Sequence, residues 1–280
     1  MSAEFIPGTL VEIATGVNRL VAPNPSMMTG PGTNTYLCGI KEVAVIDPGP
    51  NMVEHIAAIQ DLAHGKIRWI LCTHTHPDHS PAAMPLAEAT GAELMGIPAP
   101  EGKVQDKTFK PDRVLADNEL LETGEFSIRA IHTPGHASNH LCFRHEEHRF
   151  LFTGDHIMSG STVVIDPPDG NMKHYLKALA RLKELDLAAM APGHGPVIDN
   201  PDEVVDWLIE HRLKREAKVV TMLESNPGIS LRDLTMHVYN EVDPGLHRLA
   251  SRSLLAHLLK LEDDGRATCR EERWSLTSVD

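Results

Sequence analysis

The sequence lacks any long run of apolar residues. No stretch of its 280 residues approaches the roughly 18 consecutive apolar residues that a membrane-spanning helix needs. The N-terminus, Met1-Ser2-Ala3-Glu4, also lacks a basic region followed by an apolar run, so we expect no secretory signal. The sequence therefore predicts a cytoplasmic protein without a membrane partner.

Cysteine is scarce as well. The four cysteines are scattered along the chain and form no CxxC pair: Cys38, Cys72, Cys142 and Cys269. This pattern excludes a disulfide framework and favours buried or free thiols in a reducing compartment.

The sequence also has no excess of positively charged residues. The formal net charge is −13, and residues 1–210 carry all of it, whereas residues 211–280 are neutral overall. An acidic main body does not attract phosphate chains. The charge therefore argues against tight, non-specific binding of nucleic acid, although it does not exclude local cleavage of one.

What the sequence does contain is an alternation of short apolar runs and segments of helical periodicity. Residues 43–46 and 68–72 are apolar runs of the length of buried strands. Ser80-Pro81 is a typical N-cap and first-turn pair, and it predicts a helix that ends at Gly91. This order of strands and helices predicts an α/β domain.

The last third of the chain has a different pattern. The spacing predicts one long charged helix over residues 201–225, ended by Asn226-Pro227-Gly228. Two shorter helices and two short strands are predicted after it, at residues 231–239, 252–264, 267–269 and 274–276. The order of helix, helix and hairpin resembles a winged helix. We therefore expect two domains, residues 1–215 and residues 216–280.

The strongest chemical signal is the motif His74-x-His76-x-Asp78-His79. Three histidines and one aspartate within six residues are improbable by chance, and imidazole and carboxylate groups suit zinc and other divalent transition metals. In an extended turn, residues two apart point the same way. His74 and His76 can therefore bind one ion while Asp78 and His79 bind a neighbouring one.

Three further candidate ligands follow short strands later in the chain. His136 and His194 each end the same small turn, Pro-Gly-His, and Asp155 follows a predicted hairpin strand in Thr153-Gly154-Asp155. A single histidine is more often a surface residue than a ligand, and a single aspartate is often a turn residue. The repeated context makes metal binding the better interpretation of all three.

These residues together resemble the metallo-β-lactamase superfamily. The matching segments keep the expected order and span about residues 1–215: Gly32 to Leu37, Val45 to Gly49, Thr73 to His79, Thr133 to His136, Phe152 to Asp155, and Pro192 to Pro196. The resemblance implies an αββα sandwich with metal ions at one edge, followed by the small winged-helix-like α+β domain. The chain departs from the family at Ser80-Pro81-Ala82-Ala83, where many members carry Gly-Gly. This difference weakens the inference from the substrates of the family to the substrate of this chain.

The resemblance also implies a role for each ligand. The first metal ion would be bound by His74, His76 and His136. The second would be bound by Asp78, His79 and His194, with Asp155 bridging both. Asp47 would hold the metal-binding loop in place, or would simply be a turn residue before Pro48. Two zinc ions are the expected cofactor, with iron or manganese as alternatives.

The expected activity is hydrolysis by a hydroxide held between the two ions, with Asp78 orienting the nucleophile or moving its proton. The substrate would be an ester, a thioester or a phosphodiester. The alternatives are a single-strand endoribonuclease acting on RNA, a glyoxalase II-like thioesterase, and a metal-binding winged-helix regulator without catalysis. True zinc β-lactamases of the common class carry cysteine at the position of Asp155 and are exported, so drug resistance is not the expected role.

Two histidines near the motifs in sequence, His140 and His156, are candidates for contact with substrate. The alternative is that they are ordinary hairpin or surface histidines. A homodimer is also expected as one possible assembly, with the C-terminal domain contacting substrate, nucleic acid or a second subunit.

Overall fold

The computed structural model describes residues 5–102 and 104–277, and its chain divides into two compact units. The first unit consists of Met1–Thr133, Asn139–Ser161 and Leu185–Pro201. The second consists of Pro134–Ser138, Thr162–Glu184 and Asp202–Asp280. The domain boundary predicted at residues 215 and 216 falls inside a continuous helix, and it stays a prediction.

The first unit is built on two β-sheets. One has seven strands in sequence order: β1 (Leu10–Ala14), β2 (Val17–Val21), β3 (Asn34–Cys38), β4 (Val43–Ile46), β5 (Ile67–Leu71), β6 (Glu93–Gly96) and β7 (Arg113–Val114). The other has five, in the order β12 (Ala189–Pro192), β11 (Phe150–Gly154), β10 (Leu141–His145), β9 (Ser127–His132) and β8 (Leu120–Glu122). The strands from β4 to β7 run parallel, and so do β11 and β12.

Strand β4 shows why the first sheet is covered on both faces. Its four residues are all buried, and successive side chains point to opposite faces of a strand. Ala44 and Ile46 pack in the core between the two sheets, together with Phe143 and Phe152 of the second sheet. A strand buried on both faces is apolar throughout, which explains the uninterrupted run in the sequence.

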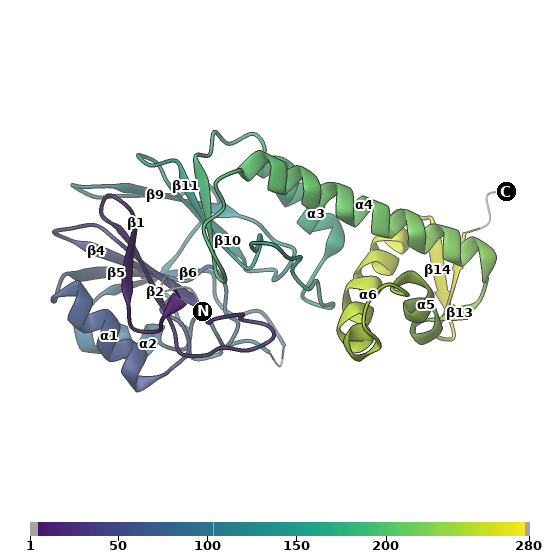
Figure 1. Cartoon of the computed structure of the whole chain (residues 1–280), viewed down its shortest axis with the longest axis horizontal. Coiled ribbons are helices and arrows are strands. Elements are labelled where there is room, and N and C mark those ends of the chain that lie inside the picture. The colour runs from purple at the N-terminus through teal and green to yellow at the C-terminus, as the bar shows by residue number, and fades with distance from the viewer. Residues whose placement is uncertain (1–4, 103, 278–280) are drawn as a thin grey trace. The chain divides into compact units, whose positions relative to one another are not determined.

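Val45 points the other way, into a second core under two helices. These are α1 (Val53–Ala63) and α2 (Ala83–Thr90), which lie together beside β4 and β5 (Figure 1). Ile59 of α1 and Leu86 of α2 are fully buried against the sheet. Gly91 ends α2 in the left-handed conformation that glycine adopts without strain, as predicted.

The predicted N-cap of α2 is wrong. The helix begins at Ala83 after Ala82, and no side chain caps it. The Ser80 hydroxyl instead donates a hydrogen bond to Asp106 Oδ2 at 2.7 Å. The reason is that residues 76–80 first form a turn of their own, in which the amides of His79 and Ser80 bond to the carbonyl of His76.

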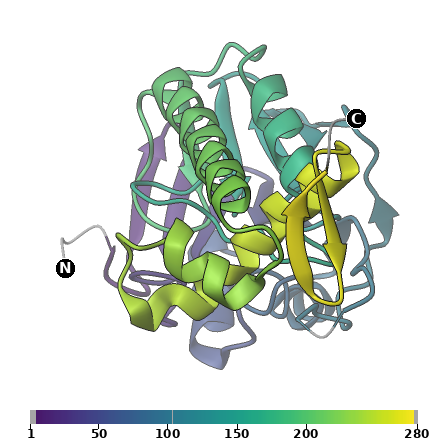
Figure 2. The same ribbon diagram turned by 90° about the vertical axis from the view of Figure 1, so that its right-hand side faces the viewer.

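The second unit carries most of the remaining helices and a small sheet. Its elements are α3 (Met172–Leu182), α4 (Pro201–Ser225), β13 (Ile229–Ser230), α5 (Leu231–Val238), η2 (Pro244–Leu246), α6 (His247–Asp263), β14 (Ala267–Arg270) and β15 (Arg273–Leu276). The predicted order of helix, helix and hairpin is confirmed, and Figure 2 shows the hairpin in yellow after α6. Apolar side chains of α4, α5, α6 and the hairpin share one core, with Leu223, Leu254 and Trp274 buried in it.

Candidate metal centre

The topology brings most of the candidate ligands to strand ends. Asp47 follows β4, and the motif from Thr73 to His79 follows its parallel neighbour β5. Asp155 follows β11, and His194 comes two residues after its parallel neighbour β12 ends. Because the carboxyl ends of parallel strands meet at the same edge of a sheet, residues distant in sequence become neighbours.

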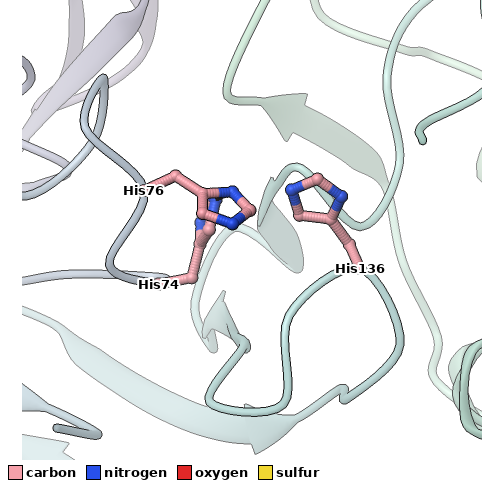
Figure 3. Close-up of side chains that lie close together, drawn as sticks. All are labelled: His74, His76 and His136. Carbon is pink, nitrogen blue, oxygen red and sulfur yellow. Dashed lines mark hydrogen bonds between the residues drawn. The ribbon is translucent and has the colours of Figure 1, made fainter. Parts of the chain in front are cut away.

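The first ligand group consists of His74, His76 and His136. One ring nitrogen of each lies within 4.8 Å of those of the other two, and Figure 3 shows the three rings facing a common space. His74 Nε2 is 2.9 Å from His76 Nδ1. A cation at this point would replace the proton that these two rings share, so the group fits a metal ion.

Hydrogen bonds at the outer nitrogens orient two of these rings. His136 Nδ1 lies 2.7 Å from the Val164 carbonyl oxygen, which can only accept, so His136 donates through Nδ1 and Nε2 is the nitrogen available to a metal. His74 Nδ1 lies 3.0 Å from the Thr73 hydroxyl, which already donates its proton to Asp47. His74 therefore also donates through Nδ1, which leaves Nε2 as the nitrogen available to a metal.

Burial keeps His74 in the neutral form that metal binding requires. Burial in the protein, and then the neighbouring His79 and His76, lower its pKa well below its ordinary value. A neutral imidazole offers a lone pair to a metal at neutral pH without first losing a proton.

The second ligand group consists of Asp78, His79, Asp155 and His194, with one atom of each within 4.8 Å of the others. His194 Nε2 lies 3.2 Å from Asp78 Oδ2 and 3.3 Å from Asp155 Oδ1. His79 Nε2 lies 3.6 Å and 3.4 Å from the same two oxygens. These separations exceed the roughly 2.7–2.9 Å of a charged N–H···O bond, so the four side chains surround a space rather than closing on one another.

The electrostatics of this second group favour a cation. Burial alone would lower the pKa of His79, but the carboxylates of Asp78, Asp155 and Asp47 outweigh it and raise the pKa well above its ordinary value. The pKa of His194 is likewise raised to about 9 by Asp155 and Asp78, against the effect of burial. Carboxylates that hold protons on two buried imidazoles would also stabilise a metal cation in their place.

Asp47 supports the second group from behind. Its Oδ2 accepts a hydrogen bond from His79 Nδ1 at 2.9 Å, which points His79 Nε2 toward the other ligands. The same carboxylate accepts from the Thr73 amide at 2.7 Å and from the Thr73 hydroxyl at 2.8 Å. A carboxylate behind a histidine is the usual way in which proteins fix the orientation of a metal ligand.

Gly193 lies against the ligands where no side chain fits. A Cβ at this position would lie 2.7 Å from His79 Cε1 and 2.9 Å from Asp155 Oδ1. His194 beside it is held by its Nδ1, which donates to the Gly32 carbonyl at 3.3 Å. The Pro-Gly-His turn therefore brings the backbone close to the site and places His194 Nε2 beside the carboxylates of Asp78 and Asp155.

His140 and His156 are buried residues, not surface residues. Both side chains are fully buried, and the ring centroids lie 5.0 Å apart for His140 and His74 and 5.8 Å apart for His140 and His156. The alternative of surface histidines is therefore wrong. Contact with substrate stays a prediction, although full burial favours packing behind the ligands.

Several residues that hold the site were not predicted. Thr73 joins Asp47 to His74, and the Asn34 side chain donates to the carbonyls of Pro192 and Gly195 at 2.8 and 2.9 Å. Asn34 lies in the Gly-Thr-Asn-Thr motif, and this motif is the sequence feature that could have identified Asn34 as a residue that holds the site. The carbonyl groups of Val164 and Gly32 have no signal in the sequence, because every residue has a carbonyl.

Two protein families have models that match this chain. The family model described as the metallo-beta-lactamase superfamily matches residues 28–194, and the one described as the beta-lactamase associated winged helix domain matches residues 230–274.

Among the helices of the described residues, none is long and apolar enough to cross a membrane.

Two relatives and one solved structure illustrate the similarity. A beta-lactamase-like protein 2 homolog from Caenorhabditis elegans is 31% identical, covering 91% of this chain and 86% of its own. An atrochrysone carboxyl ACP thioesterase from Aspergillus chevalieri is 32% identical, covering 89% and 81%. A metallo-beta-lactamase family protein from Thermus thermophilus superposes with a TM-score of 0.80 at 22% identity, covering 95% and 100%.

The expected fold class, an α/β sandwich followed by a winged-helix domain, is thereby confirmed. The expected class of activity is confirmed as well, since the family and its thioesterase relatives are hydrolases. This chain belongs to the metallo-beta-lactamase superfamily.

Proposed function

We propose that this hydrolase cleaves the thioester of a small organic acid, using two divalent metal ions, with zinc as the metal. The observation that carries the proposal is the pair of adjacent ligand groups, three histidines in one and two histidines with two aspartates in the other. A relative named as an acyl-carrier thioesterase supports the thioester over other substrates. Imidazole and carboxylate groups are ligands that zinc binds in proteins.

The metals, when bound, would lower the pKa of a water molecule and polarise the carbonyl of the substrate. The chain's own residues would do the rest. Asp78 is suited to hold the incoming water and take its proton, since its side chain is 27% exposed while its Oδ2 stays within 3.2 Å of His194. Burial would raise the pKa of Asp78, but His79 and His194 lower it, which keeps the carboxylate ionised and able to accept a hydrogen bond.

The proposed reaction consumes one water and yields an acid and a thiol. A C–O bond forms at the thioester carbon, and the C–S bond breaks. The proton taken by Asp78 passes to the departing sulfur. Asp155 would join the two ligand groups, as the family resemblance implies, and Asp47 would keep His79 oriented throughout.

The test combines metal content with a panel of substrates. Purified protein is reconstituted with zinc, iron or manganese in turn, and each form is assayed on an acyl thioester, a phenyl ester, single-stranded RNA and a chromogenic β-lactam. We expect close to two zinc atoms per chain and the highest kcat/KM on the thioester.

Two variants sharpen this test. Asp78→Asn should lower thioester turnover by roughly 10²- to 10⁴-fold, the usual contribution of a group that transfers a proton. His64→Asn is the matched control, because His64 is an exposed histidine at the end of α1, whose left-handed conformation asparagine tolerates. Faster cleavage of RNA than of any thioester would replace the proposed substrate. Fewer than one metal atom per chain, with no turnover at all, would refute the metal-dependent mechanism.

A further inference from the structure

The loop that carries His136 is held by residues of its own unit rather than by the short turn alone. The Gly135 carbonyl accepts a hydrogen bond from the Asn171 amide at 2.8 Å. The Ser138 amide donates to Asp169 Oδ1 at 3.2 Å. Both partners lie just before α3, so the loop rests on the segment that joins β11 to α3.

His136 itself contacts this segment at Val164. Its Nδ1 donates to the Val164 carbonyl at 2.7 Å, which leaves Nε2 as the nitrogen available to a metal. The Val164 carbonyl can orient the ring only if the backbone at Val164 is itself held. Val164 lies in a stretch without regular secondary structure, where no neighbouring strand fixes the peptide.

Side chains from two helices hold the backbone on either side of Val164. The Arg212 side chain, from α4, donates through Nη2 to the Val163 carbonyl at 2.5 Å. The Ser253 hydroxyl, from α6, accepts from the Ile165 amide at 3.2 Å. Asp166, the residue after Ile165, pairs with Arg252, the residue before Ser253, at 2.9 Å.

Arg212 is unusual for a residue on a long charged helix. It is only 3% exposed, and its guanidinium lies 5.4 Å above the centre of the buried Tyr175 ring. Burial of a guanidinium is costly unless its donors are used, so a buried arginine that donates to one backbone carbonyl is holding that carbonyl in place.

We propose that Arg212 and Ser253 are positioning residues that set the orientation of His136 as a metal ligand, by fixing the peptides on both sides of Val164. This inference rests on the proposed function only in taking His136 as a ligand of the first metal. It gives the C-terminal helices a role in metal binding that does not depend on the identity of the substrate.

The test measures metal affinity, with the full chain and without any substrate. Metal-free protein is titrated with zinc against a competing chelator, and cobalt is used in parallel because its absorption spectrum reports the number and kind of ligands. Arg212→Met and Ser253→Ala should each weaken one of the two metal sites by roughly tenfold, the lower end of the effect of losing a group that orients a ligand. The other site should keep its affinity. Arg212→Lys, which can still reach a carbonyl, should recover part of the loss.

Arg215→Met is the matched control. Arg215 lies one turn further along α4, donates to the Val238 carbonyl at 2.6 Å and lies 4.2 Å above the ring of Tyr239. It therefore makes the same two kinds of contact within the same unit, together with an ion pair to Glu241 at 2.6 Å, and none of them leads to His136. Its loss should lower the thermal midpoint and leave both metal affinities unchanged.

His136→Ala separates the two ways in which the reasoning can fail. If this variant keeps both metal affinities, His136 is not a ligand and the proposed metal centre is at fault. If it loses one site while Arg212→Met and Ser253→Ala keep both, the positioning role is refuted. Should Arg212→Met fail to fold, Ser253→Ala and Arg212→Lys decide the matter, because each removes less of the buried side chain.

Discussion

Replacing Asp47 with asparagine tests how the second metal ligand group is oriented. The carboxylate of Asp47 accepts three hydrogen bonds: the Thr73 amide bonds to Oδ1, while the Thr73 hydroxyl and His79 Nδ1 bond to Oδ2. Asparagine has nearly the same shape but only one acceptor oxygen. One of the two terminal positions must therefore become a donor.

The Thr73 amide decides which position becomes the donor. A backbone amide can only donate, so the asparagine oxygen must stay at the Oδ1 position, 2.7 Å from it. The side-chain amide group then faces His79 Nδ1. To accept this hydrogen bond, His79 must move its proton to Nε2, and that nitrogen can then no longer bind a metal.

We expect Asp47→Asn to weaken zinc binding at the second group by roughly 10- to 100-fold, about 1.4–2.8 kcal/mol. The assay is a zinc titration against a chelator, accompanied by the cobalt spectrum. Asp112→Asn is the control, since Asp112 accepts from the Leu94 amide at 2.9 Å and lies outside both ligand groups. Unchanged zinc affinity at both sites in Asp47→Asn would refute the argument from the fixed amide.

Three further outcomes are expected. Gly193→Ala should abolish tight binding of one metal in the same titration, because its Cβ would lie 2.7 Å from His79 Cε1, and normal zinc content would contradict this. Burial lowers the pKa of His55 in the folded chain to about 4, whereas the ordinary pKa of histidine, near 6.5, applies to the unfolded chain. The unfolding free energy should therefore decrease as the pH falls from about 6.5 toward 4. Urea denaturation of the metal-free proteins measures this loss. Between pH 7 and pH 4.5, the unfolding free energy of the unsubstituted protein should fall by roughly 2–3 kcal/mol more than that of His55→Gln, and equal decreases would exclude the role of His55. Phe143→Ala, in the core between the sheets, should cost about 3–5 kcal/mol of unfolding free energy with the metal content retained, whereas a cost below roughly 1 kcal/mol would mean that this core is loosely packed.

The sequence predicted which candidate ligands come together better than it predicted the contacts that hold them. Imidazole and carboxylate groups at strand ends are recognisable from residue type and spacing, and the structure gathers His74, His136 and His194 with their partners into two groups. The outer hydrogen bonds to Val164 and Gly32 use backbone carbonyls, which leave no mark in a sequence.

The limits of helices were predicted unevenly for a similar reason. Helix α4 was predicted at its true limits, since Pro201 and Asn226-Pro227-Gly228 mark both ends. Helix α6 begins at His247, five residues before the predicted start, because the turn signals of Pro244 and Gly245 belong to a short 3-10 helix that leads directly into it. The N-cap predicted at Ser80 is wrong because residues 76–80 form a turn of their own, so the helix begins only at Ala83.

The continuity of α4 also bears on how such proteins evolve and can be recombined. A cut between residues 215 and 216 would pass between two of its anchoring side chains. Arg215 holds α5, and Glu216, which is 6% exposed, pairs with Lys260 of α6 at 3.0 Å. The winged-helix region recognised by family similarity is therefore smaller than the piece of chain that must be inherited as a whole. Chimeras that exchange this region between two proteins should keep α4 from Pro201 onward together with α5 and α6. A graft that begins inside the helix should lose the buried ion pairs that α4 makes in each of the two parent proteins.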